Sequence, residues 1–193
     1  MIETPITKAR EETLKELERG AGISRGEREI KARKIEECYK KLAEILAETY
    51  GVPPPKVDFS WKLYTDFGPG ASYSFKKHDI RITYDTRPDE LIHEFKHYLQ
   101  DIVEKRDYDK EWEELVWNMY KKTGVFTRIW ERGEYHPLEQ DADRFSKRYS
   151  RLLESEGRKI YGSVVWITSF LRDKFRKGEI PEFVITVLRK KLD

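Results

Sequence analysis

The chain has 193 residues, of which 38% are charged and 13% aromatic, and its 38 Lys and Arg nearly balance its 36 Asp and Glu. A chain of this length is long enough for one core with additional helices, and short for two independent domains. The balanced charge and the many aromatic residues exclude an intrinsically disordered chain and a purely electrostatic binding protein.

Residue usage also limits the chemistry. Cys38 is the only cysteine, so any bound metal must be held by histidine and carboxylate rather than by a cluster of thiolates. The first 20 residues lack the apolar segment of a secretory signal, and the longest apolar run, 164–167, is too short to span a bilayer. We therefore expect a soluble cytoplasmic protein. Asn and Gln are scarce while Lys, Arg and Glu are abundant, which favours a thermophilic source.

The first fifty residues are predicted to be helical. A short helix is expected to begin near Thr7 and to end near Gly20, and Ser24 and Glu27 fit a capping box that opens a longer helix ending at Gly51. One apolar stripe along this longer helix is typical of a packing helix: Ile30, Ile35, Leu42, Ile45 and Leu46.

After the prolines at 53–55 the apolar period changes from helical to alternating. Val57, Phe59, Trp61 and Leu63 alternate with polar residues, as in a half-buried strand. Two further alternating segments, 73–75 and 80–84, flank the turn Lys-Lys-His-Asp and predict a hairpin. The prediction is thus a small sheet followed by helices over 87–104, 110–122, 137–155 and 159–177, and a last helix from Pro181.

The segment His-Glu-Phe-Lys-His, 93–97, lies in the first of these later helices. His93 and His97 are one helical turn apart, so both imidazoles can reach a single metal ion at about 2.0–2.1 Å. Glu94 is rotated by about 100° from His93, so it can lie beside the ion without binding it and accept a proton from water. The remaining positions of the helix are largely apolar, which favours a polar notch facing a cleft over two histidines placed by chance.

A zinc site of this kind needs a third protein ligand and an open fourth position. Glu139 and Asp143 are one turn apart in a helix opened by Pro137, and Ala142 between them is small enough for another helix to approach closely. We predict that Glu139 is the third ligand, and that Asp143 receives the free N–H of a ligand histidine and fixes its tautomer. The same ligand set would also suit cobalt, nickel or iron.

His-Glu-Phe-Lys-His followed by the pattern ExxADRF, 139–145, resembles the gluzincin branch of the zincin metallopeptidases, and in its compactness the minimal ImmA/IrrE-type enzymes. The resemblance covers roughly residues 56–155. It implies a zincin-like α+β fold, in which a small, mainly antiparallel sheet packs on the HExxH helix. It also implies one zinc ion on His93, His97 and Glu139, with Glu94 as the general base of peptide hydrolysis.

The resemblance further implies how a peptide would bind. The strand carrying Ile80, Ile82 and Tyr84 would be the edge that pairs with an extended protein or peptide substrate. A donor for the oxyanion is also needed, and His136, just before the Glu139 helix, is the first choice.

The C-terminal region supports a different interpretation. From Arg144 onward there are 13 Lys and Arg against six Asp and Glu, with aromatic residues at 166, 170, 175 and 183. Such a surface could bind nucleic acid, although aromatic residues at helical spacing are usually core residues. Two alternatives to a zinc endopeptidase therefore remain: a metal-binding regulator without proteolytic activity, and a nucleic-acid-associated protein. The predicted organisation is a helical extension over 1–55, a catalytic core over 56–156 and a basic helical extension over 157–193.

Overall fold

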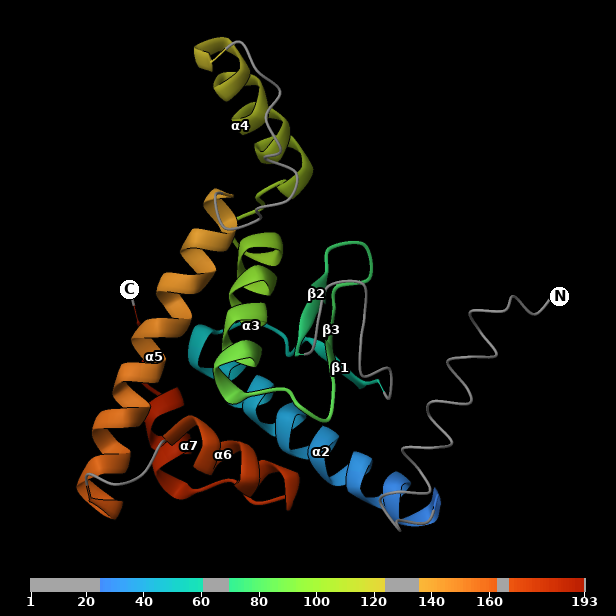
Figure 1. Ribbon diagram of the computed structural model, residues 1–193, viewed down its shortest axis with the longest axis vertical. Coiled ribbons are helices and arrows are strands. Elements are labelled where there is room, and N and C mark those ends of the chain that lie inside the picture. The colour runs from blue at the N-terminus through green and yellow to red at the C-terminus, as the bar shows by residue number, and fades with distance from the viewer. Residues whose placement is uncertain (1–24, 61–69, 124–135, 163–166, 193) are drawn as a thin grey trace, which may run out of the picture.

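The computed structural model describes residues 25–60, 70–123, 136–162 and 167–192. These residues form a mixed α+β fold that is mostly helical (Figure 1). The predicted helix near Thr7 lies outside the described residues, as do Trp61, Leu63 and Trp166. The described elements, in chain order, are α2 (Arg25–Tyr50), β1 (Lys56–Phe59), β2 (Ser72–Ser74), β3 (Asp79–Ile82), α3 (Pro88–Ile102), α4 (Tyr108–Thr123), α5 (Pro137–Tyr161), α6 (Ile167–Arg176) and α7 (Glu182–Leu188).

Within the described residues, the sheet has three strands in the order β1-β3-β2. The predicted hairpin is present, because β2 and β3 pair antiparallel with Tyr73 opposite Ile80. β1 adds to the other side of β3 in parallel, with Val57 opposite Ile80. The sheet is therefore mixed, and the expectation of a mainly antiparallel sheet missed this parallel pairing between segments distant in sequence.

This order also corrects the predicted substrate edge. Ile80 and Ile82 lie in the central strand, are fully buried, and have a neighbouring strand on each side. Tyr84 follows the strand, and the guanidinium of Arg176 lies 4.5 Å from the centre of its ring. Strand β3 is not available to pair with a peptide, and the edge strands among the parts of the sheet that the structure describes are β1 and β2.

One hydrophobic core joins nearly all the elements. It takes buried side chains from α2, β1, β3, α3, α5, α6 and α7. Phe175 and Phe183 belong to this core, which confirms the core interpretation for these two aromatic residues. The helices of both predicted extensions therefore share their packing with the sheet and α3.

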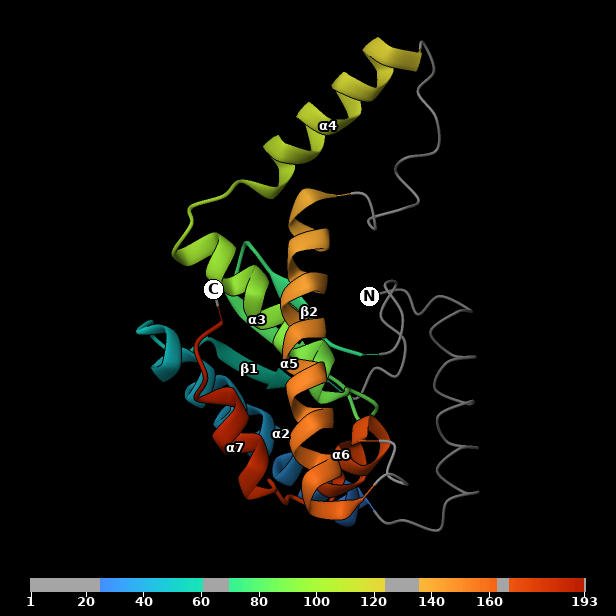
Figure 2. The ribbon, with the colours of Figure 1, turned by 90° about the vertical axis from the view of Figure 1, so that its left-hand side faces the viewer.

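The helices around the core differ in how they end. α5 and α6 are separate helices, where the sequence favoured one helix over 159–177, and Gly162 ends α5 with a φ of 79°. Near the end of α5, a β-carbon on Gly157 would lie 2.2 Å from the Cδ1 atom of Ile167, so glycine allows α6 to approach closely. α4 projects away from the rest of the molecule in both ribbon views (Figures 1 and 2), and Trp112 and Val116 form a small cluster of their own.

Candidate metal centre

α3 carries the two histidines of the candidate site. Pro88 occupies its first turn, and the carboxylate of Glu90 accepts the backbone N–H of Arg87 at 2.8 Å, which caps the helix start. The apolar side chains that pack α3 into the core are Leu91, Ile92, Phe95 and Leu99. Because these residues fix the rotation of the helix, His93 and His97 face Glu139 on α5. Glu94 faces Tyr73 in β2.

α5 supplies the glutamate. His136 is its N-cap residue, and Nδ1 of that ring accepts the backbone N–H of Leu138 at 3.1 Å. Glu139 follows in the first turn. α3 and α5 lie side by side along much of their length (Figures 1 and 2), and Ala142 is completely buried on α5. This packing places Glu139 beside His93 and His97 on α3.

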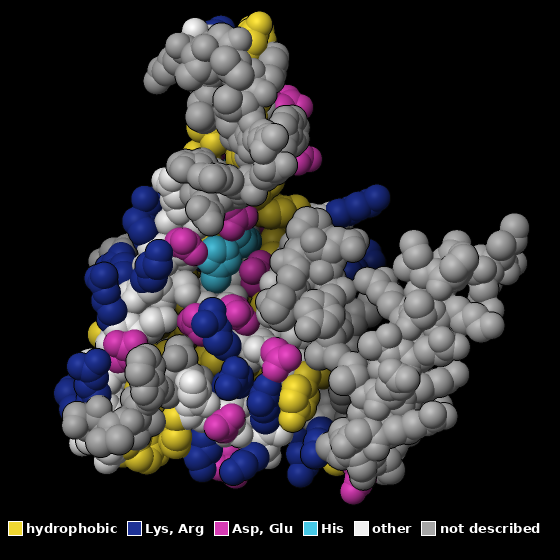
Figure 3. All heavy atoms as spheres, in the orientation of Figure 1, with side chains coloured by type: hydrophobic (Ala, Val, Ile, Leu, Met, Phe, Trp, Pro, Cys, Tyr) yellow, Lys and Arg dark blue, Asp and Glu magenta, His cyan; other side chains and the backbone are white. Residues whose placement is uncertain are grey.

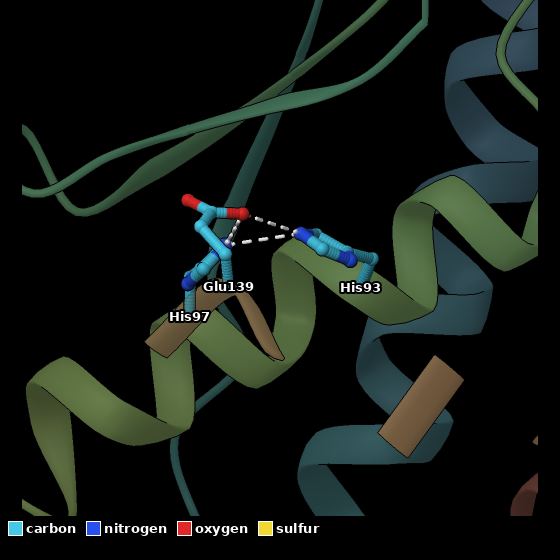
Figure 4. A group of neighbouring side chains, drawn as sticks. All are labelled: His93, His97 and Glu139. Carbon is cyan, nitrogen blue, oxygen red and sulfur yellow. Dashed lines mark hydrogen bonds and ion pairs between the residues drawn. The ribbon is translucent and has the colours of Figure 1, made fainter. Parts of the chain in front are cut away.

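Three side-chain atoms converge there (Figure 4). Nε2 of His93 lies 3.1 Å from Oε2 of Glu139, and Nε2 of His97 lies 3.2 Å from the same oxygen. The two Nε2 atoms are 3.1 Å apart. Tetrahedral ligands at about 2.0–2.1 Å from zinc are about 3.3–3.4 Å apart, so the three atoms fit a zinc ion after separating by only about 0.2 Å.

The outer nitrogens of the two rings have acceptors of their own. Nδ1 of His97 lies 2.8 Å from Oε1 of Gln100, and Nδ1 of His93 lies 3.2 Å from Oδ1 of Asp143. With a proton on each Nδ1, both Nε2 atoms present lone pairs to a carboxylate oxygen. In that state three acceptors face one another, which is unfavourable unless a proton or a metal cation lies among them. The arrangement therefore suits a metal ion.

The charges of the site are strongly coupled. Burial by itself raises the pKa of Glu139, but its hydrogen bonds with His93 and His97 outweigh burial and hold that pKa well below its usual range. Burial lowers the pKa of His93, and the hydrogen bond with Glu139, together with nearby carboxylates, raises it to a net value above the ordinary one. Glu139 is thus a carboxylate, and His93 attracts either a proton or a metal ion.

Glu94 lies next to the three converging atoms without being one of them. Its Oε2 accepts the backbone N–H of Tyr73, in β2, at 2.7 Å. Burial raises the pKa of Glu94 above its usual value, although the nearby His97 and His93 oppose the rise. A carboxylate held in place by an edge strand, with a raised pKa, is well suited to accept a proton from water and to pass it on.

The structure gives His136 a different place from the one predicted. Both ring nitrogens are engaged, because Nδ1 accepts from Leu138 and Nε2 lies 3.1 Å from the backbone oxygen of Tyr108. The ring is completely buried and stacks on Tyr108 at 4.0 Å and on Trp112 at 5.4 Å between centres. This geometry favours a structural role for His136, as the cap of α5, over the stabilisation of an oxyanion.

Two residues near the three converging side chains were not singled out from the sequence. Tyr108 donates its hydroxyl to Oε1 of Glu139 at 3.2 Å. Gln100 is fully buried and contacts His97. The position of Gln100, one turn after Lys96 and His97 on the polar face of the helix, is a signal that the sequence did contain. Tyr108 follows α3 and reaches Glu139 only through the folded arrangement.

A cleft of about 370 Å³ reaches the site from the surface. It includes His93 and Glu94 among its walls, and its opening carries charges of both signs. Figure 3 shows histidine side chains at this surface with acidic side chains around them. The cleft is lined by Ala71, Arg87, Asp89, Glu90, His93, Glu94, Asp143, Ser146, Lys147 and Ser150.

The chain matches no protein-family model, and neither curated proteins nor solved structures gave a match. None of the helices that the structure describes is long and apolar enough to cross a membrane.

Proposed function

We propose that this protein is a zinc-dependent peptidase with a zincin-like catalytic core. The observation that carries the proposal is the convergence of two imidazole nitrogens and one carboxylate oxygen within 3.2 Å of one another, with their outer N–H groups facing other acceptors. A glutamate on the same helix, outside the ligand set, adds the group that hydrolysis needs and that a purely structural metal site does not.

In this proposal His93, His97 and Glu139 hold the metal. Zinc, when bound, polarises a substrate carbonyl and lowers the pKa of water. Glu94 accepts the proton from the attacking water and delivers it to the leaving amine. Asp143 and Gln100 accept the Nδ1 protons of the two ligand histidines and orient their rings.

Strand β2, and not β3, would pair with an extended peptide substrate. β2 is an edge strand, and its Tyr73 N–H contacts Glu94, so a peptide aligned along β2 would pass beside the base. The cleft opens on the same residues, with His93 and Glu94 in its wall. Substrate is therefore expected to enter by this cleft.

The metal ligands are tested by metal content. Protein purified without chelator or nickel affinity resin should contain about one zinc ion per chain. His97→Ala and Glu139→Gln should lose most of it, because each removes one of three ligands. Gln140→Leu, at an exposed neighbouring position on α5, is the control and should retain zinc. Wild type that stays metal-free after zinc is added would overturn the proposal.

The base is tested by cleavage of a mixed peptide library, read by mass spectrometry. Glu94→Gln keeps the size of the side chain and should keep zinc, but it should lower turnover by at least about 100-fold, because it removes the proton acceptor. A Glu94→Gln protein that holds zinc and cleaves as wild type does would rule out the proposed role of Glu94. Zinc binding with no cleavage by wild type would favour a metal-binding regulator instead.

A further inference from the structure

We propose that Gln100 is a positioning residue that sets the tautomer of His97, and that α5 determines how Gln100 does so. The effect on metal affinity rests on the proposed function. The position of the proton on His97 does not depend on that function. The proposal stands on a buried amide whose donors and acceptor are all engaged on two different helices.

The environment of Gln100 is closed. Its side chain is fully buried, and its Oε1 faces Nδ1 of His97 at 2.8 Å. Its Nε2 donates one hydrogen to the backbone oxygen of Leu138 at 3.0 Å, and the other to Oδ2 of Asp141 at 3.0 Å. Both hydrogens of the amide are therefore used, and both acceptors belong to the first turns of α5.

These two acceptors fix the orientation of the amide. If the amide were flipped, its oxygen would face two other acceptors, the backbone oxygen of Leu138 and the carboxylate of Asp141, and both amide hydrogens would lose their acceptors. Because an unsatisfied buried polar group costs about 1–3 kcal/mol, the flipped orientation is excluded. Oε1 must then face His97, and an acceptor at that position requires a proton on Nδ1.

Asp141 is held in place by a second interaction. The ammonium group of Lys96 lies 3.1 Å from Oδ2 of Asp141, the same oxygen that accepts the hydrogen bond from Gln100. Lys96 is itself mostly buried and also pairs with Glu104, which follows α3. Asp141, which accepts the hydrogen bond from Gln100, is therefore linked to both helices. The acceptor that orients the amide is therefore a fixed carboxylate.

Two of the proposed ligands depend on the same turn of α5. Leu138 and Asp141 flank Glu139, so the turn that supplies Glu139 also determines, through Gln100, which ring nitrogen of His97 carries the proton. With Nδ1 protonated, Nε2 of His97 has its lone pair toward Glu139 and His93. Packing of α5 on α3 thus prepares two ligands at once.

The tautomer can be measured in the metal-free, full-length protein by ¹⁵N–¹H NMR of the imidazole nitrogens, at a pH where the histidines are neutral. In wild type, His97 should carry its proton on Nδ1. Gln100→Leu should lose this preference, and its zinc affinity, measured by competition with a chromophoric chelator, should fall about 10- to 100-fold. Gln140→Leu, the same change at an exposed position, should alter neither quantity.

Two results would overturn the proposal. One is a wild-type His97 with its proton on Nε2, which needs no variant and so decides the matter even if Gln100→Leu does not fold. The other is a folded Gln100→Leu protein, checked by circular dichroism, that keeps the wild-type tautomer and zinc affinity. If wild type binds no zinc but its His97 carries the proton on Nδ1, and Gln100→Leu loses that preference, the positioning role stands and the peptidase proposal fails.

Discussion

In the proposed site, His93 is the residue at which protons and metal would compete most directly. Its pKa is raised above the ordinary value of 6.5, so below that raised pKa the ring would bind a proton in place of zinc. Zinc affinity should therefore fall as the pH is lowered through the raised pKa of His93, because a ligand histidine must be neutral. Chelator competition at a series of pH values checks this, and an affinity that does not change between pH 8 and pH 6 would contradict it.

The same group changes the stability of the metal-free protein in the opposite direction. Since the folded pKa of His93 is raised, its contribution to stability is fully present below about 6.5 and is lost as the pH rises through the folded value. Metal-free wild type should therefore exceed metal-free His93→Gln in unfolding free energy by more at pH 6 than at pH 8. Urea denaturation of both proteins at the two pH values gives this difference.

His136 should matter for stability rather than for turnover. His136→Ala removes the side-chain cap of α5, which costs about 1 kcal/mol of unfolding free energy, and also removes a ring stacked between Tyr108 and Trp112. His136→Asn should recover the capping part alone, because asparagine is a favoured N-cap residue. Equilibrium unfolding measures both variants. A variant with wild-type stability but strongly reduced turnover would restore the oxyanion role predicted from the sequence.

At the scale of single residues, the sequence predicted the parts of the site that depend on local geometry. His93, Glu94 and His97 lie within five residues of one helix, so their relation follows from the helical repeat alone. Glu139 and Asp143 were also expected, and the structure brings both to His93. The surroundings of His136 could not be predicted in this way, because they are made by Tyr108 and Trp112 from another helix.

At the scale of helices and strands, the contact between α3 and α5 decides whether the ligands meet. Ala142 is completely buried on α5, where a larger side chain would push the two helices apart. Ala142→Leu should lower the unfolding free energy by about 1–3 kcal/mol through overpacking, and it should weaken zinc binding because Glu139 moves away from α3. Ser155→Leu, at an exposed position of the same helix, should do neither. Denaturation and chelator competition measure the two effects.

The secondary structure was predicted well where a local signal existed. The glycine at 51 and the prolines at 88, 137 and 181 lie at or beside the ends of helices in the structure. The hairpin of β2 and β3 could be predicted from its turn and its alternating residues. The pairing of β1 with the other side of β3 could not be predicted. Nothing in the sequence of β1 shows that it pairs in parallel with a strand more than 20 residues away, so β3 was mistaken for an edge.

At the scale of the whole molecule, the site links two helices of the one large core, so a bound metal should stabilise the entire fold. Free zinc at 100 times its dissociation constant adds about 2.7 kcal/mol to the unfolding free energy. For a chain of this size that corresponds to a rise in Tm of roughly 5–10 °C. Addition of chelator should reverse the rise, and His97→Ala should show no response to either zinc or chelator. Equal Tm values for wild type with and without zinc would count against a metal site in the core.

The position of Glu139 in the first turn of α5 has an electrostatic consequence. The start of this 25-residue helix carries about half a positive charge from its aligned peptide dipoles, which by itself repels a divalent cation. Glu139, Asp141 and Asp143 lie in the first two turns and offset this field, although only Glu139 is placed to bind the ion. The acidity of this helix start would thus help the proposed site to hold a cation.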